Sequence, residues 1–140
     1  MKLSAKTEYA CLAMLQLAEE FDSGELVQIR RIADVHGIPQ RFLVQILLQL
    51  KSASLIASTR GAAGGYRLAR SPHEITLAEV IEVMDGDDRP DASAAQSTPL
   101  ARALLEIRRE LHESQRERLE SATLADLVEL AAGREPMWYI

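Results

Sequence analysis

Cysteine and aromatic residues are both scarce in this sequence. Cys11 is the single cysteine among 140 residues, so one chain cannot form an internal disulfide, a cysteine-based zinc site or a four-thiolate iron–sulfur cluster. This usage is typical of the reducing cytoplasm, where we expect the protein to act. Aromatic residues supply 4% of the chain and hydrophobic residues 47%, which predicts a core made mainly of Leu, Ile, Val and Ala.

A long uninterrupted apolar run is missing as well. The N-terminal stretch over residues 1–15 comes nearest, but Glu8 and then Gln16 interrupt its apolar residues and no cleavage site follows. We therefore expect neither a signal peptide nor a membrane span.

Residues that could carry catalysis or hold a metal are too scattered to predict a site. His36, His73 and His112 include no pair at i,i+4 spacing and have no companion ligands. No Ser/His/Asp or paired-carboxylate arrangement follows from the spacing. We predict no metal, no cofactor and no enzymatic activity. Cys11 is expected to be a small buried residue, with a redox switch through its single thiol as the alternative.

Charge is distributed unevenly along the chain. Residues 1–70 have a balance of +3, whereas residues 71–140 carry −8 of the total −5. Between Arg30 and Arg70 there are seven basic residues and one acid, Asp34. Such asymmetry indicates a half that binds a polyanion joined to an acidic half, although ordinary scatter of surface charge is the alternative.

The first half of the chain is predicted to contain three helices. Ser4 is a suitable N-cap for a helix over residues 4–20. A short helix over residues 30–37 ends at Gly37, and a helix over 39–51 has its proline in the first turn. Two helices joined by a short turn are the outline of a helix-turn-helix. The second of them has apolar residues at helical spacing: Phe42, Leu43, Ile46, Leu47 and Leu50.

A glycine-rich stretch, "STRGAAGGYRLA" at residues 58–69, follows these helices. It lacks the Lys-Ser/Thr pair of a phosphate-binding loop and the following helix of a dinucleotide site. Tyr66 and Leu68 alternate as in a packed strand, which predicts a β-hairpin with a long tip. The hairpin is either a wing whose Arg60 and Arg67 face phosphates or a minor groove, or a hairpin with two solvated arginines.

Beyond the hairpin, a further helix and a polar segment are predicted. The helix ends at Gly86 and has Thr76 as its N-cap, with Glu79 three residues on to complete a capping box. Residues 87–98 are polar and predict a loop or linker.

A single apolar row runs along a long helix predicted over residues 99–121, with Thr98 as its cap. A helix with one apolar row and no partner in its own chain requires one from another chain. We therefore expect a homodimer, formed through Leu100, Leu104, Ile107 and Leu111. A short helix over 123–133 and an apolar tail over 134–140 follow, and the role of Met137–Ile140 is not assigned.

A helix, a helix-turn-helix and a hairpin follow each other in the order of a winged helix. The predicted fold is mainly α with a small β-hairpin. It comprises a winged helix-turn-helix domain over residues 1–86, the linker 87–98, and a region 99–140 with the dimerisation helix. The second helix of the pair would enter a DNA major groove. It presents side chains that can pair with adenine or guanine, namely Gln40, Arg41 and Gln45.

The stretches "TEYACLAMLQLA", "QIRRIADVHGIPQRFLVQILLQLKSASLIASTRGAAGGYRLA" and "ITLAEVIEVMDG" resemble the Rrf-two family of bacterial winged-helix transcriptional regulators. This is the group of IscR, NsrR and CymR. The resemblance is dense over residues 1–86 and resumes over the long helix and "LESATLADL". It implies a DNA-binding homodimer, a repressor, on a roughly palindromic operator with half-sites about one or two helical turns apart.

The resemblance also implies the roles of individual residues. The recognition helix corresponds to residues 39–51, and Arg60 matches the family's wing arginine, expected in or along the minor groove. Many members have a glycine at Ala63 and a glutamate at Val44, so their operator preference is not carried over. The glycines Gly61, Gly64 and Gly65 permit positive φ and would let the tip lie close to the sugar–phosphate backbone. The predicted DNA-binding residues are Lys2, Lys6, Gln28, Pro39, Gln40, Arg41, Gln45, Arg60, Gly61, Gly64, Gly65 and Arg67.

Sensing members of the family hold an iron–sulfur cluster with three cysteines ahead of the long helix. Here that window, "DDRPDASAAQSTPL", contains none, and Glu8, which matches an acidic ligand of some members, cannot hold a cluster alone. We predict a member without a cluster. The alternative function is a winged-helix module that docks a protein partner such as a metabolic enzyme. The regulon and the effector are left open.

Overall fold

A computed structural model describes residues 2–86 and 98–133 of the chain. The predicted linker lies outside the described residues except for Thr98, and the apolar tail 134–140 lies wholly outside them. No helix within the two described ranges combines the length and the apolar character needed to cross a membrane.

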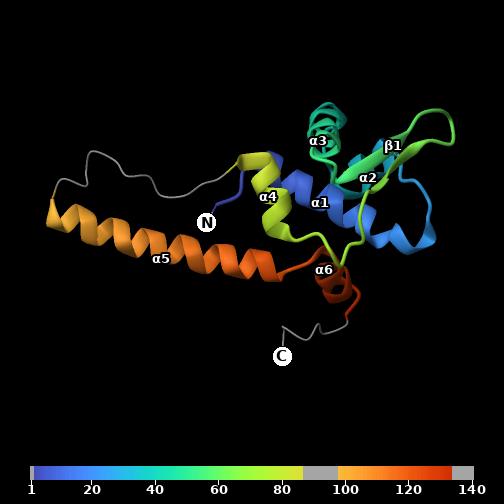
Figure 1. Cartoon of the computed structure of the whole chain (residues 1–140). Helices are drawn as coiled ribbons and strands as arrows, with labels where there is room; N and C mark the ends of the chain where they lie inside the picture. The colour runs from blue at the N-terminus through green and yellow to red at the C-terminus, as the bar shows by residue number, and fades with distance from the viewer. Residues whose placement is uncertain (1, 87–97, 134–140) are drawn as a thin grey trace.

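The long first helix, α1 (Ala5–Glu19), begins where the sequence predicts. The Thr7 amide donates a hydrogen bond to the Ser4 hydroxyl at 3.2 Å, which satisfies a donor that has no partner inside the helix. A single 3-10 turn, η1 (Phe21–Ser23), follows. α1 packs against α2, α3, α4 and α6, so it forms the centre of the domain (Figure 1).

The predicted helix-turn-helix consists of α2 (Ile29–His36) and α3 (Gln40–Ser52). Gly37 ends α2 with a left-handed φ of +64°, as expected of a residue in that position. The role of Pro39 differs from the prediction. It is the N-cap of α3 with an extended ψ of 126°, and its carbonyl accepts the first hydrogen bonds of the helix, from the amides of Phe42 and Leu43.

The predicted hairpin is formed by β1 (Ile56–Thr59) and β2 (Gly65–Leu68), which are antiparallel. Ile56 pairs with Leu68 and Thr59 with Gly65, so residues 60–64 form the tip. Val27, just ahead of α2, makes an antiparallel bridge to Tyr66 on the free edge of β2. The hairpin extends beside α2 and α3 (Figure 1), and this arrangement is that of a winged helix.

α4 (Leu77–Asp85) has the predicted N-cap but only half of the predicted capping box. The Thr76 hydroxyl accepts a hydrogen bond from the Glu79 amide at 3.2 Å, whereas the Glu79 carboxylate forms an ion pair with Arg70. A complete capping box occurs instead at α6 (Leu124–Ala131), between Thr123 and Asp126. Asp126 is shorter than the glutamate for which the motif is named.

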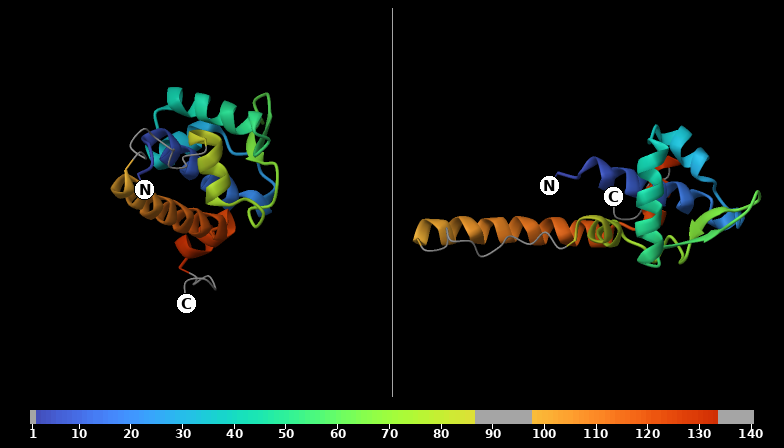
Figure 2. Two further views of the ribbon diagram at one scale, coloured as in Figure 1. Left: turned by 60° about the vertical axis from the view of Figure 1, so that its left-hand side comes forward. Right: turned by 90° about the horizontal axis from the view of Figure 1, so that it is seen from above.

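The predicted long helix is α5 (Pro99–Ser121), capped by Thr98. It projects away from the remaining helices as an arm (Figure 2). The chain then returns to the domain. There the Leu77 amide donates a hydrogen bond to the Ala122 carbonyl and the Leu124 amide donates one to the Ile75 carbonyl, both at 2.9 Å. Leu124 is fully buried in the same core as α1, so the winged helix shares its core with a residue from beyond α5.

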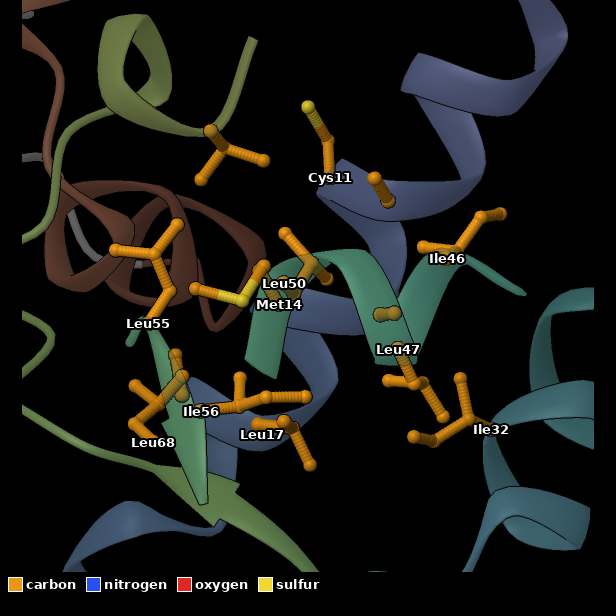
Figure 3. Close-up of a cluster of buried hydrophobic side chains, with 14 of the residues drawn as sticks. Cys11, Met14, Leu17, Ile32, Ile46, Leu47, Leu50, Leu55, Ile56 and Leu68 are labelled. Atoms are coloured by element: carbon orange, nitrogen blue, oxygen red, sulfur yellow. The ribbon is translucent and has the colours of Figure 1, made fainter. Parts of the chain in front are cut away.

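The core is aliphatic, as the scarcity of aromatic residues predicts (Figure 3). α1 supplies Ala10, Cys11, Ala13, Met14 and Leu17, and α3 supplies Leu43, Ile46, Leu47 and Leu50. Phe42 departs from the predicted apolar row, because it lies on the outer side of α3 with 48% of its surface exposed. The buried side chain of Gln16 forms a hydrogen bond with the His36 ring, 2.9 Å between Oε1 and Nε2. This bond joins α1 to α2.

Candidate nucleic-acid interface

One side of α3 is buried and the other faces solvent. Gln40, Val44 and Leu48 are spaced four residues apart, so they form one row along the exposed side. Arg41 and Gln45, which the sequence also predicts to read bases, are exposed beside this row. The three predicted base-reading residues therefore share a solvent-facing surface.

A groove of about 640 Å³ separates α3 from the hairpin. We call it the wing groove. It brings together six of the predicted DNA-binding residues, from three segments far apart in the sequence. These are Gln28, Gln40, Arg60, Gly61, Gly64 and Gly65.

The wing groove also contains residues that sequence reasoning missed. Arg30 from the start of α2 and Lys51 from the end of α3 both line it, and together with Arg60 they bring three cations to one groove. None of the described residues that line it is acidic. Lys51 lies eleven residues, about three helical turns, beyond Gln40, so helical periodicity could have placed it on the same side. Only the fold could bring Arg30 next to the hairpin.

Two other predicted residues meet on the opposite flank of α3. Lys6 of α1 and Gln45 of α3 line a second hollow of about 490 Å³, together with Ala5, Tyr9 and Phe42. The Arg41 guanidinium lies over the Phe42 ring, 4.9 Å from its centroid. The exposed row of α3 therefore stands as a ridge between the wing groove and this hollow.

The remaining predicted residues line neither hollow. Lys2 is exposed ahead of α1, and Pro39 is exposed at the N-terminus of α3. Arg67 is exposed on β2, opposite Ala57. It lies three residues beyond the tip and, unlike Arg60, does not line the wing groove.

Gly64 and Gly65 are required by the fold of the hairpin itself. A Cβ on Gly64 would lie 2.1 Å from the Thr59 carbonyl oxygen, and one on Gly65 would lie 2.8 Å from the Val27 carbonyl oxygen. Gly65 has a positive φ of +155°, whereas Gly64 does not use the positive φ that glycine permits. The close approach that excludes a side chain there is to the protein's own backbone.

Gln28 connects the hairpin tip to the helix-turn-helix. Its side-chain amide donates a hydrogen bond to the Ala62 carbonyl at 3.4 Å. Gln28 also occupies the N-cap position of α2. This predicted DNA-binding residue therefore has a hydrogen-bond partner within its own chain.

Cys11 is a buried residue of the core, as one of the two sequence interpretations expects. Burial, together with the negative charges of Asp85 and Glu8, raises the pKa of its thiol from the ordinary value of 9.0 to about 11. A reactive cysteine needs its thiolate at neutral pH. The environment of Cys11 therefore opposes the alternative of a thiol redox switch.

Comparisons with known proteins agree with this geometry. The family profile described as Rrf2, an iron-dependent transcriptional regulator, matches residues 3–130. A protein of Mycobacterium tuberculosis that carries the name of an HTH-type transcriptional regulator is 43% identical over 135 residues, 91% of this chain and 81% of that protein. The HTH-type transcriptional regulator CymR of Bacillus subtilis is 33% identical over 142 residues, 100% of both chains.

Solved structures show the same relationship. CymR, the global cysteine regulator of B. subtilis, aligns with a TM-score of 0.80 and 31% identity over 93% of this chain and 98% of its own. IscR of T. potens aligns with a TM-score of 0.76 and 34% identity over 94% of this chain and 88% of its own.

The family description names iron, and the residues of this chain do not fit an iron centre. The sequence offers one thiol, Cys11, which is buried with a raised pKa, whereas iron–sulfur clusters need several thiolates. In the part of the chain that the structure describes, no three His, Cys, Asp or Glu side chains are placed to hold a metal. The iron chemistry of the family description therefore has no donor set among the described residues.

Proposed function

This chain belongs to the Rrf2 family of transcriptional regulators, and from that premise we propose that it is a homodimeric repressor that binds a palindromic operator through α3 and the hairpin. DNA-binding transcriptional regulation, and not catalysis, is the activity of the family. The observation that supports these contacts is the wing groove, where Arg30, Lys51 and Arg60 converge beside Gln40 without an acidic neighbour among the described lining residues.

The exposed row of α3 would enter the major groove. That groove is about 12 Å wide and accepts an α-helix. Gln40, Arg41 and Gln45 would then face base edges, where glutamine pairs with adenine and arginine with guanine. Arg30 and Lys51 would contact the phosphates that border the groove, and such contacts set position and not sequence preference.

The hairpin would lie along the neighbouring strand of the DNA. Arg60 stands where the tip leaves β1, and its charge would enter a narrow minor groove or pair with a phosphate. Ala62 and Ala63 carry no polar side-chain atoms, so base identity would be read mainly by α3. The hydrogen bond from Gln28 to the tip would help to hold the hairpin at a fixed distance from α3.

The proposed dimer contact is the apolar row of α5. Leu100, Leu104, Ile107 and Leu111 are between 54% and 84% exposed, on a helix that projects from the domain (Figure 2). Pairing this row with its copy would remove the apolar side chains from water. A two-fold axis would then place two α3 helices on one face of the DNA, about 34 Å or a multiple apart.

Repression and cytoplasmic location are part of the same proposal. A dimer on its operator blocks access of polymerase to overlapping DNA, so occupancy alone suffices to repress. The protein would act where the bacterial chromosome is, in the cytoplasm.

Binding to DNA as a function of salt tests the proposed function. The full-length protein is used to select duplexes from a random pool, and its affinity for the selected operator is measured between 50 and 200 mM salt against a scrambled duplex. We expect preference for the operator, with a slope of about −5 in log affinity against log salt if the three basic residues of each protomer neutralise one phosphate each. Binding without salt dependence or sequence preference would instead favour the protein-docking alternative.

A further inference from the structure

Two exposed apolar side chains lie in the middle of the surface that we propose to face DNA. Val44 is 48% exposed and Leu48 is 60% exposed, although the neighbouring Leu43 and Leu47 are completely buried in the core. Both Val44 and Leu48 line the wing groove. They follow Gln40 in the exposed row, one helical turn apart.

Apolar side chains in this row limit what α3 can recognise. Neither Val44 nor Leu48 can accept a hydrogen bond from the amino group of cytosine or donate one to guanine. Among the base edges in the major groove, the one apolar group is the C5 methyl of thymine. Apolar surface gains free energy when it is removed from water against another apolar group, so a thymine methyl is the base-edge feature that these two side chains can favour.

We infer that each operator half-site presents thymine methyl groups to Val44 and Leu48. The inference rests on the proposed DNA binding and adds the base that this part of α3 selects. Residues four apart are about 6 Å apart along a helix axis, and successive base pairs are about 3.4 Å apart along the duplex. The two side chains therefore reach neighbouring or next-neighbouring base pairs when α3 lies along the groove.

Gln40 extends the same preference to the start of the helix. It occupies the same row one turn before Val44, and its amide can pair with the major-groove edge of adenine. An adenine contacted by Gln40 and thymines contacted by Val44 and Leu48 make an A·T-rich segment under α3. Arg41, which lies beside the row, would contact a guanine at the edge of that segment.

Removal of single methyl groups from the DNA tests this inference. Each thymine of the selected operator is replaced in turn by deoxyuridine, which lacks only the C5 methyl. We expect one or two positions per half-site at which affinity falls about fourfold, the value of burying about one methyl group. At these positions a cytosine should bind more weakly than 5-methylcytosine, because the latter restores the methyl.

Protein variants assign the contact to the two residues. Val44→Ala and Leu48→Ala should each bind the operator more weakly and lose the sensitivity to deoxyuridine at one position, while keeping that sensitivity at the other. Val35→Ala is the matched control, because Val35 is 59% exposed on α2 and does not line the wing groove. This control should keep the full sensitivity.

The possible outcomes separate this inference from the proposed function. Selected, salt-dependent binding with equal affinity for thymine and deoxyuridine at every position would overturn the inference and leave DNA binding intact. Methyl sensitivity that persists in both α3 variants would also overturn it. If no duplex is selected from the pool, the proposed function and this inference both fail.

Discussion

Val27 and Tyr66 exchange two backbone hydrogen bonds: the Val27 amide donates to the Tyr66 carbonyl at 2.9 Å, and the Tyr66 amide donates to the Val27 carbonyl at 2.8 Å. This isolated bridge attaches the chain just ahead of α2 to the free edge of β2. Because Val27 lies two residues ahead of α2, the bridge sets the position of the hairpin relative to the helix-turn-helix. The width of the wing groove therefore depends on this pair.

Gly64→Ala should disturb the hairpin, because the added Cβ would lie 2.1 Å from a backbone oxygen of Thr59 that cannot move aside freely. We expect a loss of about 1–3 kcal/mol in the free energy of unfolding, the usual cost of overpacking, together with weaker operator binding. Urea unfolding and amide exchange at Tyr66 measure the effect. Ala63→Ser adds one heavy atom at an exposed position of the same tip and should leave stability unchanged. An unaltered unfolding midpoint in Gly64→Ala would contradict the steric argument.

Arg60→Ala should weaken operator binding by about 1–3 kcal/mol, in the range of a good groove contact, and should make the salt slope shallower by about one for each protomer. Fluorescence anisotropy titrations at several salt concentrations give both quantities. Arg109→Ala is the control, since Arg109 is exposed on α5, away from the wing groove. Equal affinity of wild type and Arg60→Ala for both operator and random DNA would count against the role of the hairpin.

Leu104→Glu combined with Leu111→Glu should convert the proposed dimer to monomers, because each change places a charge in the apolar row of α5. Sedimentation equilibrium measures the mass. Arg102→Gln with Arg109→Gln alters the net charge by the same amount, but lies on a different face of the helix from the row, and should remain dimeric. A dimer that survives the two glutamates would locate the interface elsewhere.

The stability of the protein should depend on Cys11 at alkaline pH. Below about pH 9 the thiol is protonated in both the folded and the unfolded protein, and its contribution to the free energy of unfolding is fully present. As pH rises toward the folded pKa of about 11, the unfolded thiol ionises first and that contribution is lost. The stability difference between wild type and Cys11→Ala should therefore shift against wild type between pH 9 and 11, as measured by urea unfolding.

The same pKa predicts slow chemistry at Cys11 in the folded protein. At pH 8, iodoacetamide should alkylate the native thiol at least about a hundredfold more slowly than the urea-unfolded thiol, because the thiolate is correspondingly rarer. Similar alkylation rates in the native and the urea-unfolded protein would instead favour the alternative of a redox switch.

No iron–sulfur cluster should copurify with the protein, because a single cysteine cannot supply the thiolates that a cluster needs. After purification without oxygen, we expect iron and sulfide far below one per chain and no visible absorbance above 320 nm. A stoichiometric cluster would overturn this prediction.

Local features of the chain were the most predictable. Ser4, Thr76 and Thr98 cap their helices as predicted, because a cap depends on one side chain and an amide three residues away. Gly37 ends α2 for an equally local reason, its left-handed φ. Phe42 could not be placed correctly, because helical spacing puts it at the border of the apolar row, and only the packing of α1 and α3 decides which border residues are covered.

The sequence by itself determined the order of the main helices and strands, the caps at Ser4, Thr76 and Thr98, the aliphatic core and the base-reading candidates of α3, since all of these depend on propensity and periodicity within a few residues. Only the tertiary structure decided that Arg30 and Lys51 join Arg60 in one groove, that Gly64 is needed for contact with Thr59, and that Val44 and Leu48 remain outside the core. These outcomes depend on how distant segments pack. The Val27–Tyr66 bridge sets the distance between the hairpin and the helix-turn-helix, and the core shared by α1 and α3 decides which side of α3 is buried; neither follows from a local sequence pattern.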